Sequence, residues 1–249
     1  MMLLLKLPLL MAAVLSLGLA TSFSPSASKG REYYEQRGEV VWEVPTDRKV
    51  IALTFDDGPH PVHTDHILKL LKQYDAKATF FVVGNRAAKY PELVRRAAME
   101  GHEIGNHTYT HPYFNRNRHT ETMRRELSDT HDAIFRATGQ PPHLFRPPGG
   151  YYNEAVVHMA KQSGYLVILW SWDQDTNDWR SPGTGRIVRK VLDHDHNGDI
   201  VLFHDFIEGR TQTVDALRVI LPELKQRGYQ FVTVSELLSM RKSVPVKKP

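Results

Sequence analysis

The sequence lacks cysteine altogether, and this absence excludes several kinds of chemistry. There is no disulfide framework, no cysteine zinc site and no thiol nucleophile. A glycine-rich phosphate fingerprint is also missing after every predicted strand, which excludes a dinucleotide-binding site. The candidates for chemistry are therefore the carboxylates and imidazoles of this chain.

The body of the chain also lacks an excess of either charge. The formal net charge is +4, but residues 241–249 carry four basic side chains and no acidic one. Without this basic tail the body is balanced, which argues against nucleic-acid binding and leaves the tail as a weakly anion-seeking extension.

The length of 249 residues suits one large α/β domain, which we expect over residues 48–240. The hydrophobic fraction of 41% is sufficient for a buried core. Lys6 is the only charged residue before a largely apolar run from Leu7 to Ala20. Residues 1–28 are therefore typical of a signal peptide or an N-terminal membrane anchor, and we favour export with cleavage. Residues 29–47 are expected to be a linker and lead-in. Either way, the domain is expected outside the cytoplasm.

Strand-like and helix-like patterns alternate from Val50 onward. The predicted strands are Val50–Phe55, Ala78–Val83, Glu103–Asn106, His143–Arg146, Tyr165–Trp170, Asp199–Phe203 and Tyr229–Thr233. The predicted helices are Thr64–Tyr74, Pro91–Met99, Glu121–Thr138, Asn153–Ser163, Gly185–Asp193, Thr211–Arg227 and Ser235–Met240. This alternation implies a parallel sheet, either open and doubly wound or closed into a barrel.

Polar clusters follow the carboxyl ends of most of these strands. A barrel brings all such ends to one rim, whereas an open sheet gathers only those near its switch point. We therefore predict an α/β fold of the TIM-like (β/α)7 barrel type.

Two adjacent carboxylates, Asp56 and Asp57, stand at the end of the first predicted strand, which Gly58 and Pro59 stop abruptly. Like charges this close resist sharing a site unless a cation compensates them. A divalent metal together with a general base explains the pair.

His107 and His111 are the imidazoles that such a metal needs. Their spacing puts both rings on one face of a helical turn, but Pro112 disfavours helix at His111, so we expect a tight turn or a single helical turn. Two histidines and one carboxylate form a three-ligand site with room for water, the pattern of catalytic zinc. Alone, the pair is equally consistent with ordinary loop histidines.

Three further clusters follow later strands. Arg146 can pair with a carboxylate and keep it ionised. The loop Trp170–Trp179 holds three tryptophans and three acids, and indole faces suit sugar rings or acyl groups. His204, beside Asp205, suits a general acid or base. Each also has an ordinary structural interpretation: a turn with a surface arginine, a loop pinned by core tryptophans, and a packed histidine.

Two other histidine clusters are expected to stay outside the site. His60, His63 and His66 drift around a helix rather than converge. The group His194–His196 precedes its strand, at the opposite rim of a barrel.

Five motifs occur in the order of a known family: TFDDGP (54–59), HTYTH (107–111), RPPGG (146–150), DTNDW (175–179) and LFH (202–204). Through them, residues 50 to about 238 resemble the polysaccharide deacetylases with a NodB homology domain, carbohydrate esterase family 4. The resemblance implies a distorted (β/α) barrel with fewer than eight full units, the glycoside hydrolase/deacetylase fold. It also implies a divalent metal and hydrolysis of N-acetyl groups on amino-sugar polymers.

The resemblance assigns the metal to Asp57, His107 and His111. Asp56 resembles the catalytic base, and Arg146 the residue that tunes it. Two imidazoles and a carboxylate suit zinc first, with cobalt, nickel and manganese as alternatives.

The other half of the implied machinery lies later in the chain. His204 resembles the general acid and Asp178 its partner, while Trp179 and Leu202 resemble walls of the acetyl pocket. The expected substrate is peptidoglycan, ahead of chitin-type oligomers. An O-acetyl esterase and a non-catalytic glycan-binding protein remain the alternatives.

One position departs from the family pattern. Many members carry a bulky residue where this sequence has Gly149. The Gly149 amide can still serve an oxyanion, because that role needs no side chain. Tyr151 or Tyr152 is expected to fill the space beside the sugar.

Overall fold

The computed structural model describes residues 29–114, 120–207, 209 and 211–242. The predicted leader, residues 1–28, and all but the first two residues of the basic tail lie outside these ranges. Within the ranges, none of the helices combines the length and the apolar character that a membrane span requires.

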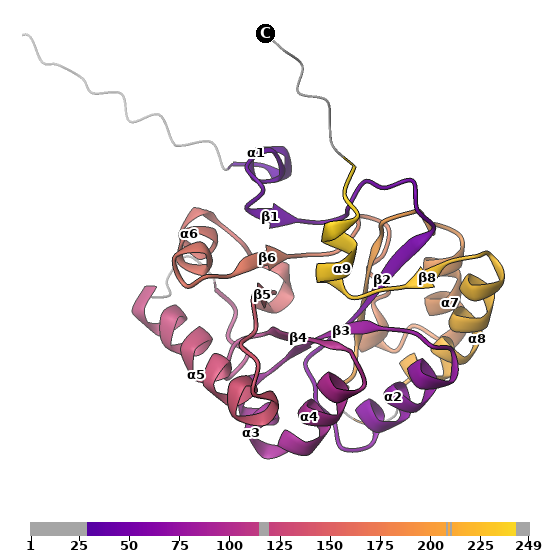
Figure 1. Cartoon of the computed structure of the whole chain (residues 1–249), viewed down its shortest axis with the longest axis horizontal. Coiled ribbons are helices and arrows are strands. Elements are labelled where there is room, and N and C mark those ends of the chain that lie inside the picture. The colour runs from indigo at the N-terminus through magenta and orange to yellow at the C-terminus, as the bar shows by residue number, and fades with distance from the viewer. Residues whose placement is uncertain (1–28, 115–119, 208, 210, 243–249) are drawn as a thin grey trace, which may run out of the picture.

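A curled, all-parallel sheet forms the centre of the molecule, and helices surround its outer side (Figure 1). The strands are β1 (Val40–Val41), β2 (Val50–Asp56), β3 (Ala78–Val82), β4 (Glu103–Asn106), β5 (Leu144–Phe145), β6 (Leu166–Ile168), β7 (Ile200–His204) and β8 (Gln230–Phe231). Their order is β1-β6-β5-β4-β3-β2-β7, and β8 pairs with the start of β2. The predicted distorted (β/α)7 barrel is confirmed.

Most of the helices lie where the sequence predicts them. They are α1 (Arg31–Gln36), α2 (His63–Gln73), α3 (Gly84–Lys89), α4 (Pro91–Met99), α5 (Thr120–Thr138), α6 (Glu154–Gln162), α7 (Thr184–Leu192), α8 (Thr213–Gln226) and α9 (Val234–Ser239), with 3-10 turns η1 (Pro148–Gly150) and η2 (Asp178–Arg180). The segment 29–47, expected to be a linker and lead-in, instead contains α1 and the edge strand β1, which pairs with β6. A two-residue strand shows no period in sequence, which is why the pattern did not reveal it.

Strand β2 shows how the sheet positions polar side chains. Leu53 and Phe55 pack in the cluster that faces the helices, whereas Ala52 packs in the cluster inside the barrel. Because side chains alternate along a strand, Asp56 also faces the inside, at the carboxyl end of β2. The amino end of the barrel is closed by α9, whose buried Leu237 belongs to the inner cluster.

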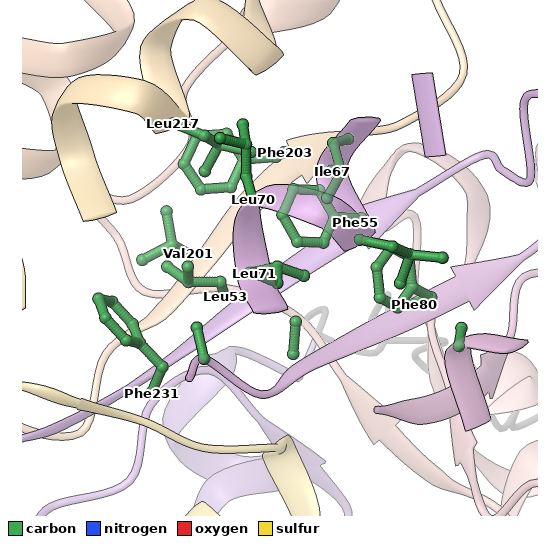
Figure 2. Packing of buried hydrophobic residues seen from close by; sticks show 14 of the residues in the cluster. Leu53, Phe55, Ile67, Leu70, Leu71, Phe80, Val201, Phe203, Leu217 and Phe231 are labelled. Carbon is green, nitrogen blue, oxygen red and sulfur yellow. The ribbon is translucent and has the colours of Figure 1, made fainter. Parts of the chain in front are cut away.

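The outer core gathers between the sheet and the helices that cover it (Figure 2). Phe55 of β2 stacks on Phe80 of β3 and on Phe203 of β7, with ring centroids 5.1 and 5.6 Å away. These three rings hold together the strands that carry the paired carboxylates and His204.

We expect Phe55→Ala to lower the free energy of unfolding by about 3–5 kcal/mol, because it removes a fully buried ring and leaves a cavity. Urea unfolding followed by circular dichroism measures the effect. Phe135→Ala on α5 is the control, since that ring is half exposed and its loss should change stability by no more than about 0.5 kcal/mol. Equal losses in the two variants would contradict the assigned core.

Candidate active site

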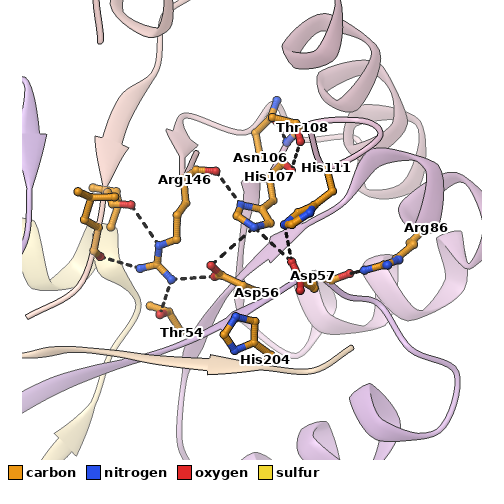
Figure 3. Close-up of polar contacts among 12 residues, drawn as sticks. Thr54, Asp56, Asp57, Arg86, Asn106, His107, Thr108, His111, Arg146 and His204 are labelled. Atoms are coloured by element: carbon orange, nitrogen blue, oxygen red, sulfur yellow. Dashed lines mark hydrogen bonds and ion pairs between the residues drawn. The ribbon is translucent and has the colours of Figure 1, made fainter. Parts of the chain in front are cut away.

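Loops at the carboxyl ends of β2 and β4 bring Asp57, His107 and His111 together (Figure 3). One ligand atom from each lies within 4.8 Å of the others. The Nε2 atoms of His107 and His111 are 3.3 and 3.0 Å from Asp57 Oδ1. This is the three-residue set predicted to bind a metal.

The tautomer of His107 supports a cation at this place. Its Nδ1 lies 2.6 Å from the Arg146 carbonyl oxygen, which can only accept, so Nδ1 carries the proton. In the neutral ring, Nε2 then presents a lone pair toward Asp57 Oδ1, a buried oxygen with no hydrogen-bond donor in acceptable geometry. Two electron-rich atoms converge here, and a metal ion between them would satisfy both.

The backbone around the ligands is strained. Asp57, Thr108 and His111 all adopt the left-handed region, with φ of 75°, 68° and 59°. Side chains other than glycine rarely adopt it, and such residues cluster at functional sites. A left-handed Thr108 is incompatible with helix, so the alternative of a helical turn between the histidines is wrong and the tight turn is what forms.

Glu126 of α5 holds this turn in place. Its Oε2 accepts hydrogen bonds of 2.7 Å from the backbone amides of Tyr109 and Thr110, and its Oε1 accepts one of 2.6 Å from the Thr110 hydroxyl. Buried Asn106 adds a fourth bond, because its Oδ1 accepts from the Thr108 amide at 2.9 Å. Neither role could be predicted from the sequence, because the Glu126 contact depends on where α5 packs and the Asn106 contact depends on how the chain turns after β4.

Asp56 is fixed by a fully buried arginine. Arg146 Nη1 donates to Asp56 Oδ1 and to the Thr54 hydroxyl, both at 2.7 Å. Its other nitrogens donate to the carbonyl oxygens of Ile168 and Leu169 at 3.1 and 2.7 Å. The surface-arginine interpretation of this motif is therefore wrong, and the carboxylate keeps a permanent cationic partner.

His204 lies beside Asp56 in the β2–β7 register and is oriented by buried Asp178. His204 Nδ1 donates to Asp178 Oδ1 at 2.7 Å, and the Thr213 hydroxyl donates to Asp178 Oδ2 at 2.6 Å. Burial lowers the pKa of His204, but the Asp178 carboxylate outweighs burial and raises it to about 9. The Nε2 atom remains for a ligand in the pocket.

Asp205, the sequence neighbour of His204, does not orient it. Its carboxylate lies beneath Gly58, where an added Cβ would come within 2.1 Å of Oδ2, and it accepts from the Thr64 hydroxyl at 2.5 Å. Burial raises the pKa of Asp205 to about 7. This buried group therefore supports the loop that carries Asp57.

A hollow of about 220 Å³ opens over these groups. Its lining includes Asp56, Asp57, His204, Gly149, Leu202, Trp179, Trp170, Asp175 and Tyr113. Asp56, Asp57 and His204 thus share one cavity with the predicted wall residues.

The space beside Gly149 is filled by a residue that the sequence analysis missed. A Cβ on Gly149, whose φ is 63°, would lie 2.7 Å from Tyr113 and 3.1 Å from Tyr151. Tyr151 is exposed and packs edge-on against Tyr113, whereas Tyr152 packs against Trp42. Tyr151 is therefore at the rim of the cavity, and the expectation for Tyr152 is wrong.

Among the described residues, the discounted histidines stay apart from the Asp57 group. The rings of His60 and His63 stack on each other with centroids 3.9 Å apart. His194 and His196 line a separate hollow beside the start of β7.

We expect Glu126→Gln to weaken metal binding roughly tenfold or more, because groups that orient metal ligands typically contribute this much. The amide can no longer accept from both the Tyr109–Thr110 amides and the Thr110 hydroxyl. Titration of the metal-free protein with Zn²⁺ or Co²⁺ gives the Kd. Glu121→Gln, an exposed acid on the same helix, should leave it unchanged, and a parallel loss there would argue against the assigned contact.

Comparison with known proteins places this geometry in a family. The model of the polysaccharide deacetylase family matches residues 43–168. A peptidoglycan-N-acetylglucosamine deacetylase of Bacillus cereus is 51% identical over 208 residues, covering 84% of this chain and 97% of that protein. A chitooligosaccharide deacetylase of Bradyrhizobium is 36% identical over 237 residues, covering 87% of this chain and 99% of that protein.

Solved structures agree in fold. A peptidoglycan N-acetylglucosamine deacetylase superimposes with a TM-score of 0.78 and 35% identity over 85% of this chain and 98% of that one. A family 4 acetyl xylan esterase from Clostridium thermocellum, solved with a cobalt ion, superimposes with a TM-score of 0.70 and 34% identity, covering 80% of this chain and 100% of that one. A CE4 family pseudoenzyme from Bacillus anthracis superimposes with a TM-score of 0.74 and 29% identity, covering 82% of this chain and 70% of that one. The chain belongs to the polysaccharide deacetylase family, carbohydrate esterase family 4.

Proposed function

We propose that this protein is a metal-dependent polysaccharide deacetylase that hydrolyses N-acetyl groups of amino-sugar polymers and releases acetate. One observation carries the proposal. The arginine-bound carboxylate Asp56 and the aspartate-bound His204 line the same hollow as Asp57, the carboxylate of the Asp–His–His group. A base, an acid and a metal site in one cavity suit hydrolysis of an amide.

Asp57, His107 and His111 would hold the metal. A bound divalent cation polarises a carbonyl and lowers the pKa of water. Two nitrogens and one carboxylate oxygen favour zinc, although cobalt, nickel and manganese accept the same donors. The cobalt ion in the related acetyl xylan esterase supports this range of metals.

Asp56 is the general base in this proposal. Arg146 Nη1 donates to its Oδ1 and holds the carboxylate at the hollow, so it can take the proton from the attacking water. Gly149 lies in the wall of the same hollow, and in this proposal its backbone amide stabilises the oxyanion that forms on the acetyl group.

His204 is the general acid. Asp178 fixes its ring through Nδ1 and favours the protonated form, so Nε2 can give a proton to the sugar nitrogen as the C–N bond breaks. Acetate and a free amine are the products. Leu202, Trp179 and Trp170 form apolar walls that suit the acetyl methyl group.

We propose peptidoglycan as the substrate, ahead of chitin-type oligomers. The similarity to a peptidoglycan deacetylase over nearly its full length supports this order, and the chitooligosaccharide deacetylase supports the second choice. We further propose that residues 1–28 direct export or anchor the chain at the membrane. Such a leader would bring the domain to the cell wall, where this substrate lies.

An O-acetyl esterase is a second candidate, favoured by the structural similarity to the acetyl xylan esterase. The same residues could cleave an ester, whose alcohol leaves more readily than an amine. Rates on acetylated xylan and on N-acetylglucosamine oligomers distinguish the two functions.

A non-catalytic glycan-binding protein is the third candidate, because a CE4 family pseudoenzyme shares the fold. The retained base, ligands and acid favour catalysis. Binding of oligomers without any acetate release would favour the pseudoenzyme.

We expect the metal-loaded protein to release acetate from N-acetylglucosamine oligomers and peptidoglycan, and Asp56→Asn to lower turnover about 100-fold or more by removing the base. Acetate is measured by a coupled enzymatic assay. Asp129→Asn on α5 is the matched control and should leave turnover unchanged.

Dialysis of the protein against a chelator should abolish acetate release, and added Zn²⁺ or Co²⁺ should restore it. Acetate release that is unaffected by the chelator would refute the metal role.

We expect Asp178→Asn to move the alkaline limb of the pH–rate profile to lower pH. The acid must be protonated, so activity falls as pH rises through the pKa of His204, which Asp178 raises to about 9. Without that carboxylate the pKa falls and the loss of activity begins earlier. Measurement of kcat/KM across pH tests this, and an unshifted alkaline limb would rule out His204 as the acid.

A further inference from the structure

The two edge strands of the curled sheet, β1 and β7, meet at a seam. The contacts across it include the Val44 amide donating to the Gly198 carbonyl at 3.0 Å and an isolated antiparallel bridge between Glu43 and Asp199. A second hollow of about 320 Å³ opens at this seam. We call it the seam hollow, and its lining includes Trp172, Asp173, Glu43, His194, His196 and Asn197.

Trp172 is the most unusual residue there, because 82% of its surface is exposed. Its loop is not loosely held. Buried Ser171 exchanges backbone and side-chain bonds with Ile200, and buried Gln174 donates to the His194 carbonyl at 2.8 Å. The indole is therefore displayed on a turn that is fixed at both ends, and such preorganisation lowers the entropy cost of binding.

The surroundings of this indole suit a sugar. Carboxylate, amide and imidazole groups line the seam hollow beside Trp172, and the volume is near the lower end of the roughly 300–1,000 Å³ common for ligand sites. An indole face packs against the C–H face of a pyranose, while side chains such as Asp173 and Asn197 can bond its hydroxyls. Two of the carboxylates have cationic partners, since Glu43 pairs with Arg31 at 3.0 Å and Asp173 with Lys190 at 3.7 Å, so charges of both signs lie at this hollow.

The same loop also serves the catalytic cavity. Trp170, Asp175 and Trp179 lie before and after Trp172 in sequence, and all three line the cavity that contains Asp56 and Asp57. A polymer held at the seam would be retained beside the enzyme between catalytic events, at a raised effective concentration.

We infer that the seam hollow is a second saccharide site, which binds an N-acetylated amino sugar of the polymer outside the catalytic cavity. The identity of the sugar rests on the proposed function, but the binding itself does not. Trp172 supplies the stacking face, and Asp173 and Asn197 supply hydrogen bonds.

The test measures binding to insoluble peptidoglycan in an Asp56→Asn background, so that the probe is not consumed. We expect Trp172→Ala to weaken retention roughly three- to tenfold, the range that one aromatic contact contributes. Trp172→Phe should restore part of it, and Phe135→Ala, another exposed aromatic ring, should change nothing. Asn197→Ala, tested separately, should weaken retention without altering the indole.

In the active background, Trp172→Ala should release acetate from a soluble N-acetylglucosamine dimer at the wild-type rate. Unchanged retention on peptidoglycan would overturn the second site. An equal loss of dimer turnover would overturn it too, since Trp172 would then be acting through the catalytic cavity. Failure of the proposed function has a different signature: no acetate from the wild type, with retention that still depends on Trp172.

Discussion

The buried ion pair between Arg146 and Asp56 is the contact on which the site depends. A guanidinium with no exposed surface is costly, and it persists here because a carboxylate, the Thr54 hydroxyl and two main-chain carbonyls satisfy it. The same residue also orients a proposed metal ligand, since its carbonyl accepts from His107 Nδ1. One residue thus contacts both the proposed base, Asp56, and the proposed metal ligand, His107, so loss of Arg146 would disturb both.

Around this pair, the catalytic geometry is distributed over distant elements. Glu126 of α5 holds the turn between the histidines, Thr213 of α8 bonds Asp178, and Asp205 after β7 lies against Gly58. These contacts explain how strained left-handed residues such as Asp57 persist, because surrounding bonds determine their conformation. The helices are therefore part of the site as well as of the scaffold.

The sequence predicts the parts of this structure that local rules govern. Buried β-branched runs gave most of the strands, and the rule that barrel loops meet at one rim placed Asp56, His107 and His204 together. The sequence did not predict strand β1, which is too short to show a period. It also did not predict that Tyr113 lies against the space above Gly149. Nor could it distinguish Asp178 from Asp205 as the partner of His204 without the family resemblance. Those choices depend on how loops fold against each other, which no local pattern records.

Tyr113 also bears on why the glycine is tolerated. In the family pattern a side chain at position 149 would stand beside the sugar, but here the phenol ring of a neighbouring loop occupies that place. The ring belongs to the segment that carries His111, against which it packs at 5.9 Å between centroids. This wall of the proposed substrate site thereby contacts a proposed metal ligand, His111, as well as Tyr151 of the arginine loop. Tyr113 therefore lies between the space above Gly149 and the His111 ring, so its side chain connects the proposed sugar wall to the proposed metal site.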